Sequence, residues 1–171
     1  MLPEVIFPPK VSGFYERKSG PPALLPVADL KQALHDLDGL GIQWQLIDFS
    51  HQPNYSYHVC FISWQDKGYF FFMNKYYYLA AFSQIEDMEE WQNWEEGQLL
   101  PRNQYTDIPQ LHDILSTPWT ILPEEMIIQK VDADNEISQK IVMNLQNAEF
   151  AEFSYWEPQN MGNILFNNWE K

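Results

Sequence analysis

The 171-residue sequence is poor in bases, glycine and cysteine, and each shortage argues against a class of protein. Ten lysines and arginines face 24 aspartates and glutamates, which gives a net charge of −14. Such a charge attracts basic partners and disfavours binding to DNA, RNA or anionic lipid. The single cysteine, Cys60, cannot form an internal disulfide, which is typical of a reducing compartment. Seven glycines leave little for a nucleotide-binding loop.

Long apolar runs are also lacking. The longest, YFFFMNKYYYLAAF at 69–82, is interrupted by Asn74 and Lys75, and it is shorter than the roughly 20 residues that a transmembrane helix needs. The first residues, MLPEVIFPPKVSG, hold an acid and prolines where a secretory signal would hold bases and an unbroken apolar stretch. We therefore expect a protein of the bacterial cytoplasm without membrane contact.

Motifs for catalysis or metal binding are absent too, including C-x-x-C, H-E-x-x-H and G-x-S-x-G. The stretch DADNEISQKIVM at 132–143 begins like a calcium loop, but Ile137 replaces the turn glycine and Met143 the bidentate glutamate. His58 and Cys60 would share one face of a strand and could act as base and nucleophile. A lone cysteine in such an aromatic stretch is more typical of a small buried hydrophobe. We expect no catalytic residue, metal or cofactor.

The sequence does contain clear helix and strand patterns, with a hydrophobic fraction of 45%. PVADLKQALHDLDGLG at 26–41 has the apolar spacing of a helix that ends at glycine. Three strands joined by the short links SHQPN and QDKG are predicted in IQWQLIDF, YSYHVCFISW and YFFFM. We therefore predict a single α+β domain over 1–171, an antiparallel β-meander flanked by helices. A proline-rich segment at 1–26 should be extended, on the surface or along a sheet edge.

Other segments follow from local patterns. KYYYLAAF at 75–82 either adds a strand or bends into a helix. Thr106 or Asp107 should cap a short helix with an apolar face. The apolar face of that helix should consist of Leu111, Ile114 and Leu115. One or two helices are expected in 123–146 and a late strand in AEFAEFSYWEP (148–158). A terminal helix or turn is expected in 160–171, anchored by Ile164, Leu165 and Trp169.

The most unusual stretch is SQIEDMEEWQNWEEG at 83–97, which holds six carboxylates, two tryptophans and no base. Ser83 and Glu86 have the spacing of a capping box, so a helix is expected over 84–96. At helical spacing Trp91 and Trp94 fall on the half opposite most of the acids.

Charge in this predicted helix opposes its own stability, because acids three or four residues apart repel each other by roughly 0.2–0.5 kcal/mol per pair. Departures from local stability are typical of binding surfaces, and aromatic residues often anchor interfaces. A solvated helix face is the alternative. The candidate partner-binding residues are Glu86, Asp87, Glu89, Glu90, Trp91, Trp94, Glu95 and Glu96; a second acidic group is Glu124, Glu125, Asp132, Asp134 and Glu136.

The C-terminal run YWEPQNMGNILFNNWEK resembles a pattern of small bacterial immunity proteins from polymorphic toxin and contact-dependent growth inhibition systems. The pattern ends in Trp-Asp, where this chain has Trp-Glu. The resemblance covers about a tenth of the chain and implies an inhibitor that binds one toxin domain, often a nuclease, and has no catalysis of its own. A tail packed by its aromatics is the alternative. The residues that carry the resemblance are Tyr155, Trp156, Pro158, Gly162, Leu165, Phe166, Asn167 and Trp169.

Together these features favour an acidic cytoplasmic immunity protein that neutralises a cognate basic toxin domain, with neither nucleic acid nor membrane as partner. Two other classes stay open. An aromatic fraction of 16% allows a small-molecule-binding protein or enzyme with an aromatic pocket. The charge is equally compatible with an acidic regulatory subunit of a larger assembly.

Overall fold

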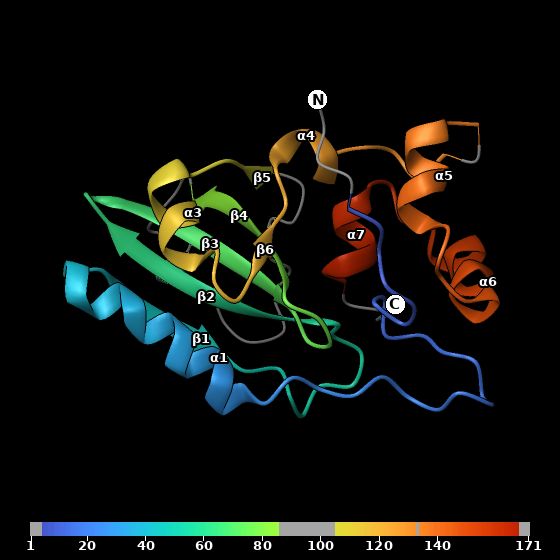
Figure 1. Ribbon diagram of the computed structural model, residues 1–171, viewed down its shortest axis with the longest axis horizontal. Helices are drawn as coiled ribbons and strands as arrows, with labels where there is room; N and C mark the ends of the chain where they lie inside the picture. Colours follow the sequence, from blue (N-terminus) through green and yellow to red (C-terminus); the bar gives the residue numbers. More distant parts are fainter. Residues whose placement is uncertain (1–4, 86–104, 133, 168–171) are drawn as a thin grey trace.

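A six-stranded sheet forms the centre of the protein in a computed structural model, which describes residues 5–85, 105–132 and 134–167 (Figure 1). Four consecutive strands form an antiparallel meander, and the short strands β5 and β6 both pair with β4, β5 antiparallel and β6 parallel. The predicted α+β meander is confirmed. The strands are β1 (Gln43–Ile47), β2 (Tyr57–Trp64), β3 (Lys67–Asn74), β4 (Leu79–Ile85), β5 (Tyr105–Thr106) and β6 (Thr120–Ile121).

The turn between β2 and β3 fixes the register of the central strands. Gln65 and Asp66 have φ angles of 52° and 62°, which is what a two-residue type I′ hairpin turn requires. Pairing then starts at Trp64 opposite Lys67 and continues along both strands. A shift by one residue would move every side chain to the opposite face of the sheet. The predicted QDKG hairpin is thus confirmed.

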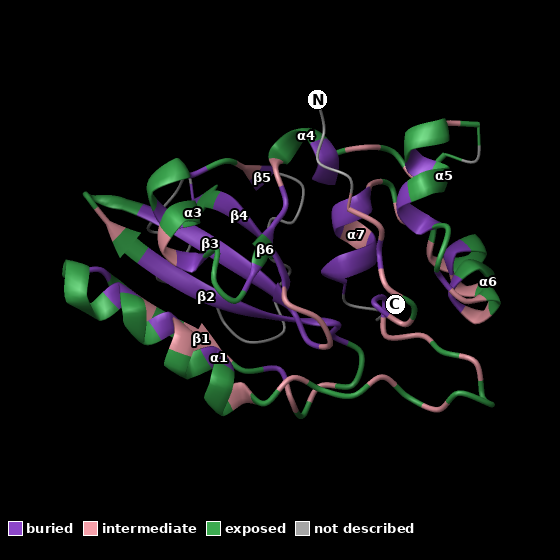
Figure 2. Cartoon of the chain, viewed as in Figure 1, coloured by how far each residue is buried: buried purple, intermediate pink, exposed green. Residues whose placement is uncertain are grey.

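Strands β2, β3 and β4 are buried on both faces, as Figure 2 shows. On one face Cys60, Phe71 and Phe82 pack under three helices; on the other, Phe61 and Phe72 pack against the N-terminal segment and the C-terminal helices. Continuous apolar runs such as YFFFM suit a strand that is covered on both sides. The first group is α1 (Val27–Leu34), η1 (His35–Leu40) and α3 (Pro109–Leu115), and the second is α4 (Glu124–Ile127), α5 (Glu136–Val142), α6 (Asn147–Trp156) and α7 (Met161–Leu165).

Several local predictions are confirmed. The helix predicted at 26–41 is α1 followed by η1, which ends at Gly41 with a φ of 68°. The region 123–146 forms two helices, α4 and α5, with the Asp-Asn-rich stretch between them. KYYYLAAF leads into β4 rather than into a helix.

The proline-rich segment contains no helix or strand over residues 5–26, as expected from its composition. It does not lie only on the surface, however. Phe7 and Val11 are fully buried, and the Phe7 N–H donates a hydrogen bond to the Ile141 carbonyl (2.8 Å). The segment therefore forms part of the core beside α5.

The predicted capping box at Ser83 is wrong. Ser83 is fully buried in β4, where it pairs with Phe70 on one side and Tyr105 on the other. Gln84 and Ile85 also belong to this strand, so the helix predicted over 84–96 does not begin there. Its remaining residues lie outside the described part of the chain. Pairing with two neighbouring strands overrides a local capping pattern, because it satisfies the backbone on both edges of β4.

The cap predicted for α3 is also wrong. The residue before the helix is Ile108, which provides no side-chain cap. The carboxylate of Asp107 instead accepts a hydrogen bond from the Glu124 N–H (2.9 Å), at the start of α4. This partner lies 17 residues away in the sequence, so local spacing could not identify it.

The late strand predicted in AEFAEFSYWEP is helix α6. Gln146 and Glu149 form a capping box at its start, in which each side chain accepts a hydrogen bond from the other residue's backbone N–H. Glu149 and Phe153, one turn apart, are its buried residues. The helical spacing of these two residues, rather than the looser alternation of aromatics, determines the structure.

The C-terminal tail packs as the helix α7, and its Ile164 and Leu165 are fully buried, as predicted. Trp169 lies outside the described residues. Gly162 lies against the ring of Tyr105, and a Cβ at this position would come within 2.6 Å of that ring. Tyr105 in turn packs against Phe72 and Phe166, so the ring has little room to move.

We predict that Gly162→Ala lowers the free energy of unfolding by about 1–3 kcal/mol, because the added methyl group overpacks the contact with Tyr105. Urea denaturation monitored by fluorescence measures this change. Gly39→Ala is the matched control, since nothing lies within 4 Å of a Cβ at Gly39. Equal stability of the two variants would contradict the predicted contact.

Candidate functional site

A groove with a volume of about 540 Å³ lies between α3 and the segment that joins β6 to α4. Its apolar part includes Phe82, Ile108 and Ile121, which belong to the core or its margin. The exposed acids Asp107, Asp113 and Glu125 and the exposed His112 also line it, and within the described part of the chain no lysine or arginine does. We call it the acidic groove; its other lining residues are Pro109 and Pro123.

The position of the acidic groove follows from the edge of the sheet. Strands β5 and β6 pair with neighbouring parts of β4, with Thr106 opposite Phe82 and Ile121 opposite Ala80. The chain then leaves both short strands at nearby points. The hydrogen bond from the Glu124 N–H to Asp107 joins these two exits, so the two segments that border the groove are connected to each other.

An apolar floor beside carboxylates suits a basic side chain. The methylene stem of a lysine or arginine covers apolar surface, while its charged head remains at the polar rim. An arginine can in addition bind a carboxylate through two parallel hydrogen bonds. Among the described residues, His112 lies beside one of these acids, with its Nδ1 3.8 Å from Asp113 Oδ1 in a contact exposed to solvent.

The candidate partner-binding residues Glu86, Asp87, Glu89, Glu90, Trp91, Trp94, Glu95 and Glu96 all lie outside the described residues. The two ends of their segment are defined, however. Strand β4 ends at Ile85 and β5 begins at Tyr105, and Ser83 pairs directly with Tyr105. The described residues before and after the acid-rich stretch thus belong to two strands that pair with each other, β4 and β5.

The second acidic group is divided by the structure. Glu125 lines the acidic groove, and the neighbouring Glu124 begins α4. Asp132, Asp134 and Glu136 are exposed around the start of α5 and do not line the groove. Asp107 and Asp113 do line it, although they were not among the candidate residues. The sequence offered only a faint signal for them: one acid just before a short amphipathic helix and one within it.

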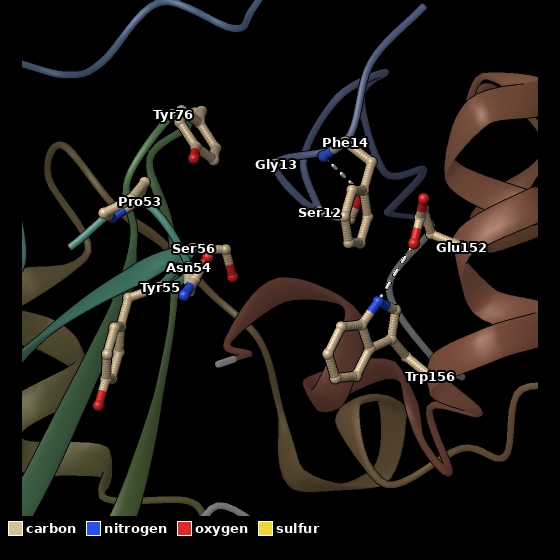
Figure 3. A pocket seen from close by; sticks show the side chains of 10 residues that line it. All are labelled: Ser12, Gly13, Phe14, Pro53, Asn54, Tyr55, Ser56, Tyr76, Glu152 and Trp156. Carbon is tan, nitrogen blue, oxygen red and sulfur yellow. Dashed lines mark hydrogen bonds between the residues drawn. The ribbon is translucent and has the colours of Figure 1, made fainter. Parts of the chain in front are cut away.

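A smaller cleft of about 280 Å³ lies where four segments meet, and Figure 3 shows its side chains. Loop residues 53–56 and Tyr76 lie on one side in that view. Phe14, Glu152 and Trp156 lie on the other. We call it the Trp156 cleft; Ser12 and Gly13 complete its lining.

His58 and Cys60 do not form a nucleophile–base pair. Burial raises the pKa of the Cys60 thiol far above its usual range, so the thiol stays protonated. Burial lowers the pKa of His58 to about 4, and its Nδ1 accepts a hydrogen bond from the Phe49 N–H (3.0 Å). The Asp48 carboxylate, 3.6 Å from the same nitrogen, therefore faces a neutral imidazole rather than an ion-pair partner at pH 7.

Lys75 is the third buried ionisable side chain in this region. It is 2% exposed, and its Nζ donates a hydrogen bond to the Gln52 carbonyl (2.8 Å). Burial lowers the pKa of Lys75 to about 8, against the opposing effect of Asp48. The ammonium group thus holds the loop before β2 against the turn after β3.

Among the described residues, no group of three or more His, Cys, Asp or Glu side chains is placed to hold a metal ion. None of the helices in this part of the chain has both the length and the apolar character needed to cross a membrane. Comparison of the chain with protein-family models, with curated proteins and with solved structures found no match.

The buried imidazole makes a prediction about pH. Since the folded-state pKa of His58 is lowered to about 4 from 6.5, the unfolded state binds more protons between these values. Stability from this group is therefore lost as the pH falls from 6.5 through 4. Between pH 7 and pH 4, the free energy of unfolding of the wild-type protein should fall by about 3 kcal/mol more than that of His58→Gln, because the glutamine side chain has no titratable proton.

Urea denaturation at several pH values measures this difference. His51→Gln serves as the control, because it makes the same substitution at an exposed histidine. Parallel stability curves for wild type and His58→Gln would show that His58 titrates normally.

Proposed function

We propose that this chain is an acidic inhibitor of the immunity-protein type, which binds a basic toxin domain one to one in the cytoplasm. A nuclease is the first class of toxin domain to test. The acidic groove is the observation that carries the proposal. It combines an apolar floor with three carboxylates, and none of the described residues that line it is a lysine or arginine. The C-terminal resemblance to immunity proteins and the net charge of −14 support the same reading.

Inhibition follows from the chemistry of the partner. A nuclease binds phosphate through lysine and arginine side chains in its cleft. When such a side chain enters the acidic groove, its stem lies along Ile108 and Ile121 and its head pairs with Asp113 or Glu125. The toxin then loses a group that its nucleic acid substrate needs, and no chemistry by the inhibitor is required.

Long-range charge supports rapid capture of the toxin. Complementary fields can raise association rates toward 10⁸–10⁹ M⁻¹s⁻¹ at low salt. Six acids lie between residues 86 and 96, in the part of the sequence that links β4 to β5. In this proposal they steer the approach of the toxin, while the groove makes the contacts that slow its dissociation.

The genomic neighbourhood provides the first test of the proposal. A toxin-bearing open reading frame directly upstream supports immunity, and its toxin domain is the probe for binding and for rescue of growth on co-expression. Neighbours that encode a metabolic pathway, together with no binding or rescue, would favour the enzyme or ligand-binding alternative instead.

With that toxin domain as probe, we predict that Asp113→Lys with Glu125→Lys weakens binding by about tenfold or more, mainly through faster dissociation. The matched control is Asp29→Lys with Asp36→Lys, on α1 and η1. Each pair of reversals changes the net charge by four, from −14 to −10. The control should slow association to a similar extent but leave dissociation unchanged.

Surface plasmon resonance at two salt concentrations separates these effects. Equal dissociation rates for the two double variants would remove the acidic groove from the interface.

We further predict that reversing Glu86, Asp87, Glu89 and Glu90 to lysine slows association and reduces its salt dependence, because these acids contribute to steering. The same binding assay measures both quantities. An unchanged association rate would exclude residues 86–90 from the interface. The immunity function would then be decided by the growth-rescue experiment alone.

A further inference from the structure

We propose that the Trp156 cleft binds a small organic cation, an alkylammonium or guanidinium group. The proposal is independent of the acidic groove, because the two sites share no lining residue. It depends on three properties of the cleft: uncompensated carboxylates on α6, aromatic rings around the space, and walls that are fixed by buried hydrogen bonds.

The charge comes from one face of α6. Glu152 lines the cleft and is half-buried. Its Oε2 accepts a hydrogen bond from Trp156 Nε1 (3.2 Å), which orients the carboxylate. Among the described residues, no lysine, arginine or histidine forms an ion pair with Glu152. A cation in the cleft would supply the missing counter-charge.

Glu149, one turn earlier on α6, adds to this charge. It is fully buried and is hydrogen-bonded to Ser12, a wall residue of the cleft. Its carboxylate accepts hydrogen bonds from neutral donors only: the backbone N–H groups of Lys10 (2.6 Å), Ser12 (3.2 Å) and Gln146 (3.0 Å), and the Ser12 hydroxyl (2.5 Å). These bonds satisfy the oxygens but bring no positive charge, so the wall of the cleft favours a cationic ligand over an anionic one.

The aromatic rings give the site its second cation-binding feature. Phe14, Tyr76 and Trp156 surround the space from different segments (Figure 3). The face of an aromatic ring is electronegative and attracts ammonium and guanidinium groups within about 6 Å. Rings together with a carboxylate therefore select a cation whose surface is partly apolar, rather than a small hydrated metal ion.

The walls are prearranged for binding. Gly13, with a φ of 93°, allows the Tyr76 ring to approach closely, since a Cβ there would lie 3.2 Å from the tyrosine hydroxyl oxygen. The buried Asn74 side chain binds the Val11 carbonyl and the Tyr76 N–H, both at 2.9 Å. It thereby holds the two walls at a fixed separation, which reduces the entropy cost of binding.

The volume of about 280 Å³ limits the size of the ligand. It lies just below the roughly 300 Å³ at which ordinary ligand pockets begin. The cleft thus suits a single cationic group, either on a free small molecule or at the end of a side chain.

Choline chloride is the probe, and 3,3-dimethylbutan-1-ol is its neutral analogue of the same shape. The full chain labelled with 5-fluorotryptophan reports binding by fluorine NMR, with the Trp156 resonance assigned from Trp156→Phe. We expect choline to shift this resonance saturably in the millimolar range. The neutral analogue and Glu152→Gln should each weaken binding about tenfold, which corresponds to about 1.4 kcal/mol.

Glu157→Gln is the matched control, because it removes the same charge from an exposed acid at the end of α6, and choline should bind it as it binds wild type. A parallel titration with N-acetylarginine amide tests the guanidinium group, and tighter binding than choline would identify a side chain as the source of the cation. Equal binding of choline and its neutral analogue would overturn the proposal. So would unchanged affinity in Glu152→Gln, or the absence of a shift with both cations.

Discussion

The buried side-chain amide of Asn74 is the interaction on which the arrangement of the other segments depends. Its nitrogen donates to the carbonyls of Val11 and Leu165, and its oxygen accepts from the backbone N–H groups of Tyr76 and Tyr77. The N-terminal segment, the end of α7 and the β3–β4 turn are thus joined at one point. Because an unsatisfied buried polar group costs about 1–3 kcal/mol, these segments are constrained to meet there. The β3–β4 turn positions β4, and β4 pairs with β5 and β6, the strands next to the acidic groove.

A sheet covered on both faces separates the two candidate sites. The acidic groove lies at the edge of β4, beside the helices that cover one face of the sheet. The Trp156 cleft forms on the other side, among the N-terminal segment, the loop before β2 and α6. Both combine carboxylates with apolar or aromatic surface, and among the described residues neither is lined by lysine or arginine. The two proposals therefore share one chemistry, recognition of positive charge, at the scale of a protein partner in one and of a single cationic group in the other.

The C-terminal residues that resemble immunity proteins have mostly structural roles here. Leu165, Phe166 and Asn167 are buried, and Gly162 makes room for the Tyr105 ring. These positions close the core over the second face of the sheet, which agrees with a tail packed by its aromatics. Trp156 differs from them, because it lines a cleft. The resemblance thus supplies no binding residues to the proposed function, and the residues proposed to bind a partner come from the charge and geometry of the groove.

By itself the sequence determined the elements that depend on local periodicity and on turn chemistry: helix α1, the meander of three strands and the QDKG hairpin. It also determined the excess of acid and the lack of catalytic motifs. Tertiary structure alone decided that Ser83 pairs within the sheet, that Asp107 binds the backbone at Glu124, and that Glu149 meets Ser12. Those contacts join groups that are up to 137 residues apart. Residue periodicity describes which face of an element is apolar, but it carries no information about which distant polar groups will meet when those faces pack together.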